Sequence, residues 1–314
     1  MKVAILGVWH VHADSYTNTA KALGEVVGVW DEDAQRRAEF AQKHGIREFN
    51  TLEELLRSDA EGVICNAATN KHREVLVAAA NAGKHIFTEK VLALTEEDCL
   101  AVKEAVERNN VRFVISFIWK ALGGYRSVKK AVDEGRIGKL NYVRFRNCHD
   151  GSTSHWLPAH FYNKEQCGGG AMIDLGAHGM YLTHWFLGEP DFYKSAFTHF
   201  CRDEQDALLN PDGIEDNAVT VMSYNDGAIA INETGFVTRG CPTMLEVGGV
   251  DGYIMQEGSK YIIRVRGKDA EELEVLPDIP KPLEFFLKGE TPEGCGIDEA
   301  IVLTRMMIGA YANM

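Results

Sequence analysis

Two residues in the second half of the chain have the types and spacing of an acid–base pair. Asp174 and His178 lie one helical turn apart, so a helix would place both side chains on one face. A carboxylate beside an imidazole fixes the ring tautomer and raises its basicity, as a general base acting on a hydroxyl requires. The same spacing occurs in pairs that only join a helix to its neighbour, and for this pair in isolation that structural interpretation is favoured.

A lysine in the first half could complete such a site. Lys90 stands in the run Thr88-Glu89-Lys90-Val91, directly after a predicted strand. A lysine at the carboxyl edge of a sheet faces the ligand crevice, where it could orient an oxygen atom or share its proton. The alternative interpretation is a solvated lysine at the end of a strand.

The N-terminal segment contains part of a dinucleotide-binding fingerprint. A short apolar strand ends at Gly7, where glycines would let the backbone approach a pyrophosphate held at a helix N-terminus. The run continues so that Trp9 and His12 occupy the two later glycine positions, which makes the match incomplete. We expect a cofactor against this loop and the neighbouring strand ends. The candidate cofactor-binding residues are Gly7, Trp9, His10, Val11, His12, Asp31, Asn66, Glu89 and Lys90.

Asp31 bears on which nicotinamide cofactor is bound. It follows the second predicted strand, where a carboxylate accepts hydrogen bonds from a ribose 2′-hydroxyl and repels a 2′-phosphate. The sequence therefore favours NAD over NADP, although Arg36 and Arg37 weaken that preference. Asp31 could equally be a loop or helix-capping residue, and the local sequence gives the two interpretations similar weight.

A segment between residues 150 and 167 has the composition of a substrate-binding lip. His155, Trp156, His160 and Tyr162 precede a run of three glycines. An aromatic ring offers an apolar face to the C–H groups of a sugar, and histidines bind hydroxyls. Lys120, near the predicted domain junction, is a further candidate for contact with substrate.

The histidines do not have the spacing of a known metal site. His10 and His12 form an HxH pair, but such a pair lacks two further ligands. His149, together with His155 and His160, likewise shows no recognised ligand spacing. We therefore expect no metal ion.

The first half of the chain alternates predicted strands and helices. Strands are expected at 2–6, 26–30, 62–66, 85–88 and 111–117, and helices at 13–23, 33–44, 51–57, 73–82 and 95–109. This alternation indicates βαβ units and a parallel sheet with right-handed crossovers.

The second half consists mainly of consecutive strands. They are predicted at 140–148, 218–224, 228–237, 244–248, 252–256 and 260–266, with a hairpin signal at Asn225-Asp226-Gly227. Helices are expected after Gly168-Gly169-Gly170 and at 297–311. The result is a large, mostly antiparallel sheet. One of its faces carries Val219, Val221, Ile229 and Ile231, and self-association would cover that face.

Composition limits the class of protein. The 314 residues are 45% apolar and 25% charged, which is typical of a globular chain long enough for two domains. The formal net charge of −13 disfavours nucleic acid and anionic membranes as partners. Seven cysteines without a CxxC indicate neither a disulfide framework nor a thiolate zinc site. With no secretion signal or membrane-spanning segment evident, we expect a cytoplasmic protein.

The order of these segments resembles the glucose–fructose oxidoreductase, inositol dehydrogenase and rhizopine-catabolism family of NAD(P)-dependent oxidoreductases. The matching segments are MKVAILG, Asp31, HREVLVAAANAGKHIFTEK from His72 to Lys90, GRIGKL from Gly135, and GGGAMIDLGAHGMYLTHWFLG from Gly168. They extend over nearly the whole chain. By position, Lys90 matches the lysine of the family's Glu-Lys-Pro motif, and Asp174 and His178 match its Asp-x-x-x-His pair.

The resemblance implies the domain organisation. We expect an α/β protein with an N-terminal Rossmann domain at 1–121 and a C-terminal α/β domain with a large open sheet at 122–296. A C-terminal helix at 297–314 would pack back on the first domain. The resemblance also implies homodimers or homotetramers.

The chain departs from the family pattern at several positions. Val91 replaces the proline of the lysine motif, Ala67 and Ala68 replace a Thr-Pro pair, Tyr181 stands where an aspartate often follows the histidine, and Trp9 and His12 replace glycines. The acid–base residues are therefore intact, while the cofactor loop is unusual.

These features favour a dehydrogenase that transfers hydride between NAD and a hydroxyl carbon of a sugar, sugar derivative or cyclitol. His178, oriented by Asp174, would take the hydroxyl proton, and Lys90 would steady the developing carbonyl. A lyase or glycosidase that oxidises its substrate transiently could use the same three residues. A non-catalytic ligand-binding relative is the third hypothesis, motivated by Trp9.

Overall fold

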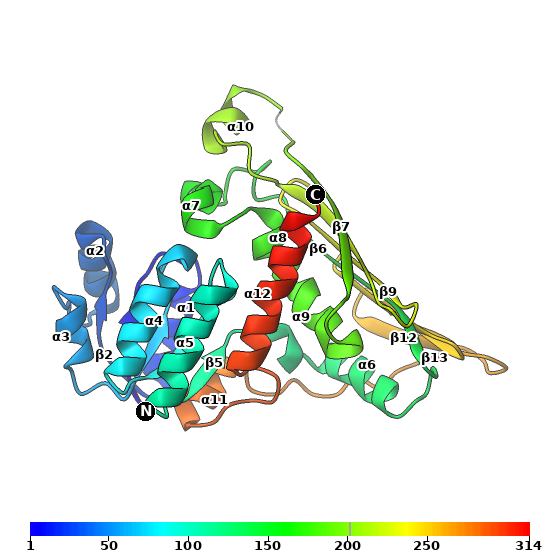
Figure 1. Ribbon diagram of the computed structural model, residues 1–314, viewed down its shortest axis with the longest axis horizontal. Coiled ribbons are helices and arrows are strands. Elements are labelled where there is room, and N and C mark those ends of the chain that lie inside the picture. The colour runs from blue at the N-terminus through cyan, green and yellow to red at the C-terminus, as the bar shows by residue number, and fades with distance from the viewer. Residues whose placement is uncertain (201) are drawn as a thin grey trace. The chain divides into compact units, whose positions relative to one another are not determined.

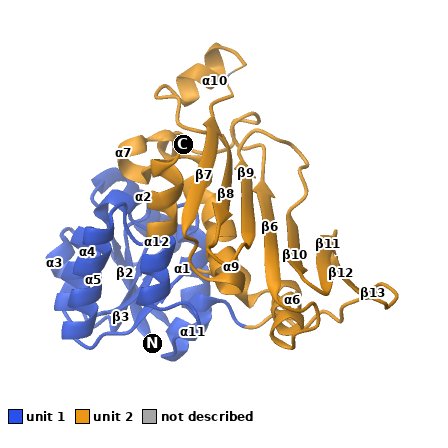
Figure 2. Cartoon of the chain, turned by 45° about the vertical axis from the view of Figure 1, so that its right-hand side comes forward, with its two compact units in different colours: residues 1–116, 280–304 blue, residues 117–279, 305–314 orange. Residues whose placement is uncertain are grey.

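A computed structural model describes residues 1–200 and 202–314 (Figure 1), so one of the seven cysteines, Cys201, lies outside the described residues. The chain divides into two compact units (Figure 2). The first contains residues 1–116 and 280–304, and the second contains residues 117–279 and 305–314. The division therefore falls slightly before residue 121, and residues 280–296 belong to the first unit rather than the second.

The return of the chain to the first unit has a simple packing reason. Helix α11 (Pro282–Lys288) carries Phe286, which is fully buried and lies 6.0 Å, ring to ring, from Phe87. A side chain added at Gly62 would lie 2.8 Å from the ring of Phe286. The glycine thus makes room for an aromatic residue more than 200 positions later in the sequence, which no local pattern reveals.

The first unit is built on a five-stranded parallel sheet in the order β2-β1-β3-β4-β5. Its strands are β1 (Lys2–Leu6), β2 (Glu25–Trp30), β3 (Gly62–Cys65), β4 (His85–Thr88) and β5 (Phe113–Ile115). Strands β3 and β4 are buried along nearly their whole length, as strands covered on both faces by helices require. The predicted βαβ architecture is confirmed.

The helices of this unit follow the predicted order. They are α1 (Ala13–Leu23), α2 (Ala34–His44), α3 (Leu52–Leu56), α4 (His72–Asn81), α5 (Glu96–Arg108), α11 and the first part of α12 (Ile297–Ala312), with a 3₁₀ turn at Thr69–Lys71. Asp33, Thr51 and Thr95 each accept a backbone N–H at the start of a helix. These caps explain why the helix starts were readable from sequence.

The second unit is built on an eight-stranded sheet in the order β13-β12-β11-β10-β6-β9-β8-β7. Its strands are β6 (Leu140–Cys148), β7 (Phe192–Thr198), β8 (Asn217–Ser223), β9 (Ile229–Gly235), β10 (Met244–Gly249), β11 (Gly252–Glu257), β12 (Lys260–Val265) and β13 (Glu271–Glu272). All neighbours are antiparallel except β6 and β9. The mostly antiparallel open sheet is confirmed. The edge strands β7 and β13 were missed, because their exposed residues lack a clear apolar alternation.

The helices of this unit are α6 (Gly123–Asp133), α7 (Lys164–Cys167), α8 (Ala171–Asp174), α9 (Gly176–Leu187), α10 (Glu204–Leu209) and the end of α12, with 3₁₀ turns at Ile118–Ala121 and Ala159–Tyr162. Helices α6, α8 and α9 pack on the sheet. Helix α9 packs on β6 and β9 in the middle of the sheet. On the other face, Val221 and Ile229 are 39% and 43% exposed, so this face is open in the single chain.

Two further observations concern the chain as a whole. None of the helices in the described ranges is long and apolar enough to span a bilayer. The six cysteines at described positions are all free thiols: Cys65, Cys99, Cys148, Cys167, Cys241 and Cys295.

Candidate active site

The loop after β1 depends on Gly7. Its backbone has φ of +78°, and a Cβ atom there would lie 2.6 Å from the Cα of Ala67. Only glycine fits this combination of conformation and close approach. The N–H of Gly7 donates to the carbonyl of Trp30, so the end of β1 is joined to the end of β2. The glycine of the predicted fingerprint is therefore required by the backbone.

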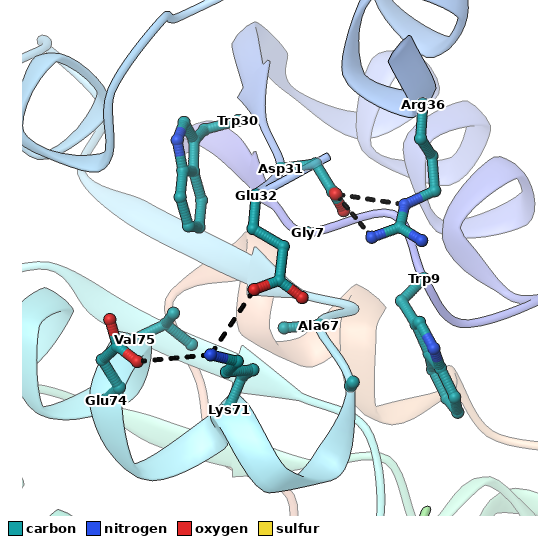
Figure 3. Close-up of a pocket in the computed structure, with 11 residues that line it drawn as sticks. Gly7, Trp9, Trp30, Asp31, Glu32, Arg36, Ala67, Lys71, Glu74 and Val75 are labelled. Carbon is teal, nitrogen blue, oxygen red and sulfur yellow. Dashed lines mark hydrogen bonds and ion pairs between the residues drawn. The ribbon is translucent and has the colours of Figure 1, made fainter. Parts of the chain in front are cut away.

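A pocket opens beside this glycine turn (Figure 3). Its wall is formed by the loop after β1, the end of β2 and the start of α4, and Figure 3 shows Trp9, Trp30 and Asp31 around it. Lys71 on the opposite side forms ion pairs with Glu32 and Glu74. The pocket lies at the carboxyl ends of parallel strands, where α/β sheets bind nucleotides.

Asp31 is buried and holds several groups in this pocket. Its Oδ2 accepts the N–H of Val8 at 2.7 Å, and its Oδ1 accepts the N–H of Asp33 at 2.9 Å. Arg36 donates to the same Oδ1 at 2.6 and 3.0 Å. The glycine turn, the carboxylate and the aromatic wall fit the adenosine half of a dinucleotide, and protein donors already engage both oxygens of Asp31.

Asn66 supports the same loop from β3. Its N–H donates to the carbonyl of Leu6, and its carbonyl accepts the N–H of His10 at 3.0 Å. The side-chain Oδ1 of Asn66 is buried and has no hydrogen-bond partner among the described residues. An unpaired buried acceptor beside the loop suits a ligand that donates a hydrogen bond.

A polar network joins the loop to the end of β4. Nδ1 of His12 lies 2.7 Å from Oε1 of Glu89, and Nδ1 of His10 lies 4.0 Å from the same oxygen. Tyr16 donates its hydroxyl proton to Glu89 and is also bonded to Ser116. Burial alone would raise the pKa of Glu89, but the two histidines hold that pKa well below its usual range. The predicted cofactor-binding residues His10, His12 and Glu89 are thus brought together.

The remaining candidate cofactor-binding residues are Lys90, Trp9 and Val11, next to Glu89 and His10 in the sequence. Lys90 is buried, and its N–H donates to Oε2 of Glu89 at 3.1 Å. The peptide bond between Lys90 and Val91 is cis, although residue 91 is not a proline. Trp9 is buried beside the pocket, whereas Val11 is half exposed at the tip of the loop.

Three glycines in the second unit allow a close approach of backbone to side chain. Gly168 ends α7 with φ of +84°. A Cβ atom at Gly169 would collide with the hydroxyl of Tyr311, and one at Gly170 would collide with the carbonyl of Glu215. The run Gly168-Gly169-Gly170 is therefore explained by packing at the start of α8.

Glu215 holds the start of α8. Its Oε1 accepts the N–H groups of Gly170 and Met172 at 2.8 and 3.2 Å, and also the hydroxyl proton of Tyr311. Burial raises the pKa of this carboxyl above its ordinary value, against the lowering effect of these donors. Sequence reasoning missed Glu215, because its partners lie some 45 and 96 residues away.

The helix carrying the acid–base pair is not continuous. Helix α8 ends at Asp174 and α9 begins at Gly176, with a break at Leu175. The predicted single helix is therefore wrong at this point. Close packing requires the glycines that follow: a Cβ atom at Gly176 would lie 2.5 Å from the sulfur of Met172, and one at Gly179 would lie 2.8 Å from the ring of Phe145.

His178 is buried among aromatic residues. Its ring stacks on Trp119 with centroids 4.9 Å apart and an interplanar angle of 19°. Its Nδ1 lies 2.8 Å from the hydroxyl of Tyr181, and that hydroxyl accepts the N–H of Trp119 at 3.2 Å. Tyr181 in turn stacks on Phe117. Tyr181, a departure from the family pattern, is thus a partner of the predicted base.

Asp174 is half-buried at the end of α8. Its charge acts on a neighbouring histidine: burial lowers the pKa of His149, while Asp174 opposes that lowering. His149 itself stacks on Phe236 with ring centroids 4.9 Å apart. Orientation of His178 by Asp174 stays a prediction.

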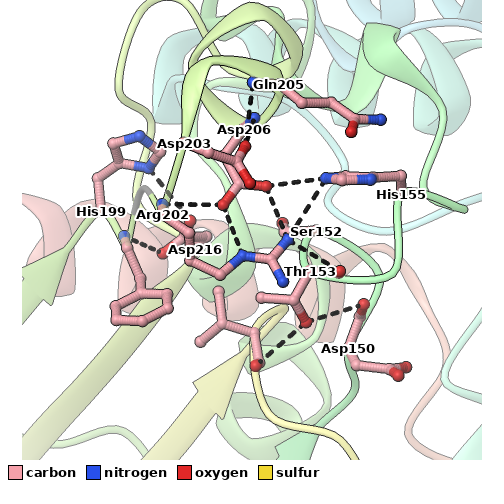
Figure 4. A network of polar contacts seen from close by, with 12 residues as sticks. Asp150, Ser152, Thr153, His155, His199, Arg202, Asp203, Gln205, Asp206 and Asp216 are labelled. Atoms are coloured by element: carbon pink, nitrogen blue, oxygen red, sulfur yellow. Dashed lines mark hydrogen bonds and ion pairs between the residues drawn. The ribbon is translucent and has the colours of Figure 1, made fainter.

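The predicted substrate lip is tied to α10 (Figure 4). His155, which has φ of +53°, places Nε2 2.8 Å from Oδ1 of Asp206. Arg202 donates to both oxygens of Asp206 and to the carbonyl of Thr153. The hydrogen bond from Arg202, followed by that from His155, holds the pKa of Asp206 well below its usual range. Asp206 and Arg202 were missed, because neither belongs to a recognisable motif.

The other lip residues have different environments. Trp156 is 54% exposed, and its indole N–H lies 3.4 Å from Asp150. His160 stands in the 3₁₀ turn Ala159–Tyr162 beside Phe161. Lys120 is buried, with its ammonium 5.4 Å from the ring of Phe117 and 5.8 Å from that of Trp185. Contact of these residues with substrate stays a prediction.

Comparison with known proteins gives the class to which this fold and these residues belong. The profile described as "Oxidoreductase family, NAD-binding Rossmann fold" matches residues 1–117, and the "GFO/IDH/MocA C-terminal domain" matches residues 125–255. The chain belongs to the GFO/IDH/MocA family of oxidoreductases. Its first unit is an NAD-binding Rossmann domain.

Among similar proteins are two with named activities. A 1,5-anhydro-D-fructose reductase from Ensifer adhaerens is 28% identical over 269 residues, which are 83% of this chain and 77% of the reductase. An inositol 2-dehydrogenase from Salmonella typhimurium is 32% identical over 233 residues. That match includes 72% of this chain and 65% of the dehydrogenase.

Solved structures share the fold. A levoglucosan dehydrogenase in complex with NADH and levoglucosan has a TM-score of 0.82 at 17% identity, covering 100% of this chain and 96% of that one. An NAD-binding oxidoreductase from Klebsiella pneumoniae has a TM-score of 0.80 at 16% identity, with coverage of 100% and 96%. At these identities the likeness concerns the fold alone.

Proposed function

We propose that this protein transfers hydride between NAD and a hydroxyl carbon of a sugar, sugar derivative or cyclitol. The observation that carries the proposal is the environment of His178. A buried imidazole, stacked on Trp119 and bonded through Nδ1 to Tyr181, has a fixed ring plane. A ring held in one plane suits a general base, because the nitrogen that accepts the proton must point at the substrate hydroxyl. The substrates named for similar proteins, anhydrofructose, inositol and levoglucosan, are all polyhydroxylated rings.

In this reaction the residues of the chain would have distinct roles. His178 holds the hydroxyl proton at an imidazole nitrogen, and its charge increases as that proton arrives. Asp174 supports the charged ring, and Lys90 donates a hydrogen bond to the oxygen that becomes a carbonyl. NAD, when bound, accepts the hydride. Asp31 and Asn66 bind the cofactor on the Rossmann side, together with Gly7, Trp9, His10, Val11, His12 and Glu89.

The substrate lip would recognise the hydroxyls of the ring. Trp156 offers an exposed indole, and His155 beside it is bonded to Asp206 at 2.8 Å. His160 and Lys120 complete the proposed substrate-binding set. An indole face packs against ring C–H groups, while imidazole and ammonium groups bind hydroxyls.

We also propose that the chain forms a homodimer or homotetramer through the open face of its large sheet. Val219, Val221, Ile229 and Ile231 lie on that face with exposed or half-buried side chains. The net charge of −13 disfavours nucleic acid and anionic membranes as partners. The free thiols are consistent with work in a reducing compartment such as the cytoplasm.

A substrate screen tests the proposed activity. Purified protein with NAD is offered a panel of sugars, anhydrosugars and cyclitols, and NADH absorbance is followed. The proposal expects at least one substrate with NADH formation that depends on His178. Product formation without accumulation of NADH would instead indicate transient oxidation, as in a lyase. Absence of both NAD binding and turnover across the panel would contradict the proposal.

A further inference from the structure

Three metal-ligating side chains of the first unit meet at one point. His10 and His12 stand on the loop after β1, and Glu89 directly follows β4. Each offers one ligand atom, and these three atoms lie within 4.8 Å of one another. The carboxylate oxygen Oε1 of Glu89 is common to the close contacts, at 2.7 Å from His12 and 4.0 Å from His10.

The donor set is that of a known class of metal site. Two histidines and one glutamate are the protein ligands of several catalytic zinc sites, which keep a fourth position open. Zinc bonds of about 2.0–2.2 Å in tetrahedral geometry place neighbouring ligand atoms about 3.3 Å apart. The separations of 2.7 and 4.0 Å lie on either side of that value. All three ligand atoms lie within 4.8 Å of one another, so side-chain movements of about 1 Å would bring them into coordination distance.

The surroundings of the cluster also suit a cation. Glu89 is 2% exposed, and a buried carboxylate needs compensating positive charge. The side chain of His12 is 38% exposed, which gives an ion a route in. The N–H of His12 now donates to Nδ1 of His10 over a long 3.2 Å, and metal binding would exchange that hydrogen bond for a coordinate bond.

Hydrogen bonds from neighbouring groups hold Glu89 in place. The ligand carboxylate accepts the N–H of Lys90 through its other oxygen at 3.1 Å. Tyr16 donates to Oε1 of Glu89 and is itself bonded to Ser116 at 2.7 Å. Such outer contacts orient ligands and contribute about 10–100-fold to metal affinity where they have been removed.

We propose that His10, His12 and Glu89 bind one divalent transition-metal ion, with zinc favoured by the donor set and the three-residue count. The HxH pair alone did not indicate this site, because the third ligand lies 77 residues away in the sequence. All three residues also belong to the cofactor-binding set proposed above, so the test of this site is made without NAD.

Zinc titration of the untagged full-length protein tests this site. The protein is treated with a chelator, desalted and titrated calorimetrically with a zinc salt, without NAD. One equivalent should bind, and Co²⁺ in its place should give the visible absorption of a tetrahedral site. His12→Asn should weaken zinc binding by more than about 10-fold, and Tyr16→Phe, which removes an outer contact, by about 10-fold.

His44 provides the matched control. It forms a 2.7 Å pair with Asp14 in the same unit, but that pair is not part of a three-ligand group among the described residues. His44→Asn should leave zinc affinity unchanged. The proposal is overturned if the wild type binds no stoichiometric zinc, or if His12→Asn and His44→Asn bind it equally well. Because NAD is absent, failure of cofactor binding or turnover leaves this test unaffected.

Discussion

The hydroxyl of Tyr181 lies 2.8 Å from Nδ1 of His178 and accepts the backbone N–H of Trp119 at 3.2 Å. A hydroxyl can donate to an imidazole nitrogen or accept from it, so this partner can follow the ring through both protonation states. A neutral phenol also stabilises an imidazolium less than a carboxylate does. Tyr181 therefore orients His178 while leaving its charge to be balanced by other groups.

Replacement of Tyr181 tests this relationship. Tyr181→Phe should reduce kcat by about 10-fold, a fraction of the full general-base contribution, and should change its pH profile. The partly buried backbone N–H of Trp119 would lose its acceptor, at a cost of about 1 kcal/mol in the free energy of unfolding. Both effects are measured by steady-state kinetics against pH and by urea unfolding.

Tyr125 is the control for that variant. It is buried and stacks on Trp119 with ring centroids 5.5 Å apart, but its hydroxyl is not bonded to His178 in the described structure. Tyr125→Phe should leave the pH profile of kcat unchanged. Equal profiles for Tyr181→Phe and the wild type would show that Tyr181 only packs against its neighbours.

Cofactor selection should depend on Asp31 and Arg36 in opposite ways. The wild type should bind NAD more tightly than NADP, because the carboxylate accepts ribose hydroxyls and repels a phosphate. Asp31→Ala should lower the ratio of the NADP to the NAD dissociation constant by about 10-fold, roughly the value of a charge-assisted hydrogen bond. Arg36→Ala removes the cation paired with Asp31 and should increase the preference for NAD over NADP. Calorimetry with both cofactors decides, and tighter NADP binding by the wild type would refute the assignment.

Glu215 should make stability fall as pH rises. Burial raises the pKa of its carboxyl in the folded state, so the folded protein holds this proton more tightly than the unfolded chain does. Deprotonation, as pH rises from the unfolded pKa of about 4.3 through the folded pKa, therefore removes stability. Glu215→Gln keeps an acceptor for the N–H groups of Gly170 and Met172. Because Gln does not titrate, the fall in the free energy of unfolding with rising pH should be smaller in this variant. Urea unfolding of both proteins from about pH 4 to about pH 7 measures the difference, and parallel curves would contradict it.

Much of the fold was readable because it rests on local signals. Alternating apolar and helical segments, together with caps such as Thr51 and Thr95, predicted the first sheet and its helices. Gly7 and the run from Gly168 stood out because backbone geometry demands glycine at those positions. Asp174 and His178 were singled out by their spacing and by the resemblance to the family's Asp-x-x-x-His pair, and their acid–base role stays a prediction.

What could not be predicted depends on contacts between distant residues. Glu215, Asp206 and Phe286 each act on partners far away in the chain, so nothing near them in sequence reveals a role. Gly176 and Gly179 allow α9 to pack tightly against Met172 and the sheet, and no local pattern indicates these contacts. Tyr181 was visible as a departure from the family, but only the structure connects it to Nδ1 of His178.

The open face of the second sheet should mediate self-association. Sedimentation at micromolar concentration should give a dimer or larger species, and Ile229→Lys should shift it toward monomer, because a charge would be buried in the contact. Leu208→Lys, at a position 81% exposed on α10, is the matched control and should leave the assembly intact. A monomeric wild type would remove the proposed interface.

Asp174 and Lys90 should be separable in a double-mutant comparison. Asp174→Asn should act through His178, so adding it to His178→Ala should cost little more than His178→Ala alone. Lys90→Ala should lower turnover independently. Steady-state kinetics of the single and double variants measures the coupling, and full additivity of Asp174→Asn with His178→Ala would show that the two residues act separately.

The most direct test of the central claim is the turnover of His178→Ala on a substrate found by the NADH screen, with the NAD dissociation constant measured alongside. A general base contributes about 10²–10⁴-fold, so kcat should fall by that factor while NAD affinity stays within a few-fold of the wild type. Preserved cofactor affinity would also show that the variant is folded. Nearly full turnover by His178→Ala would contradict the account and make the buried imidazole a structural residue.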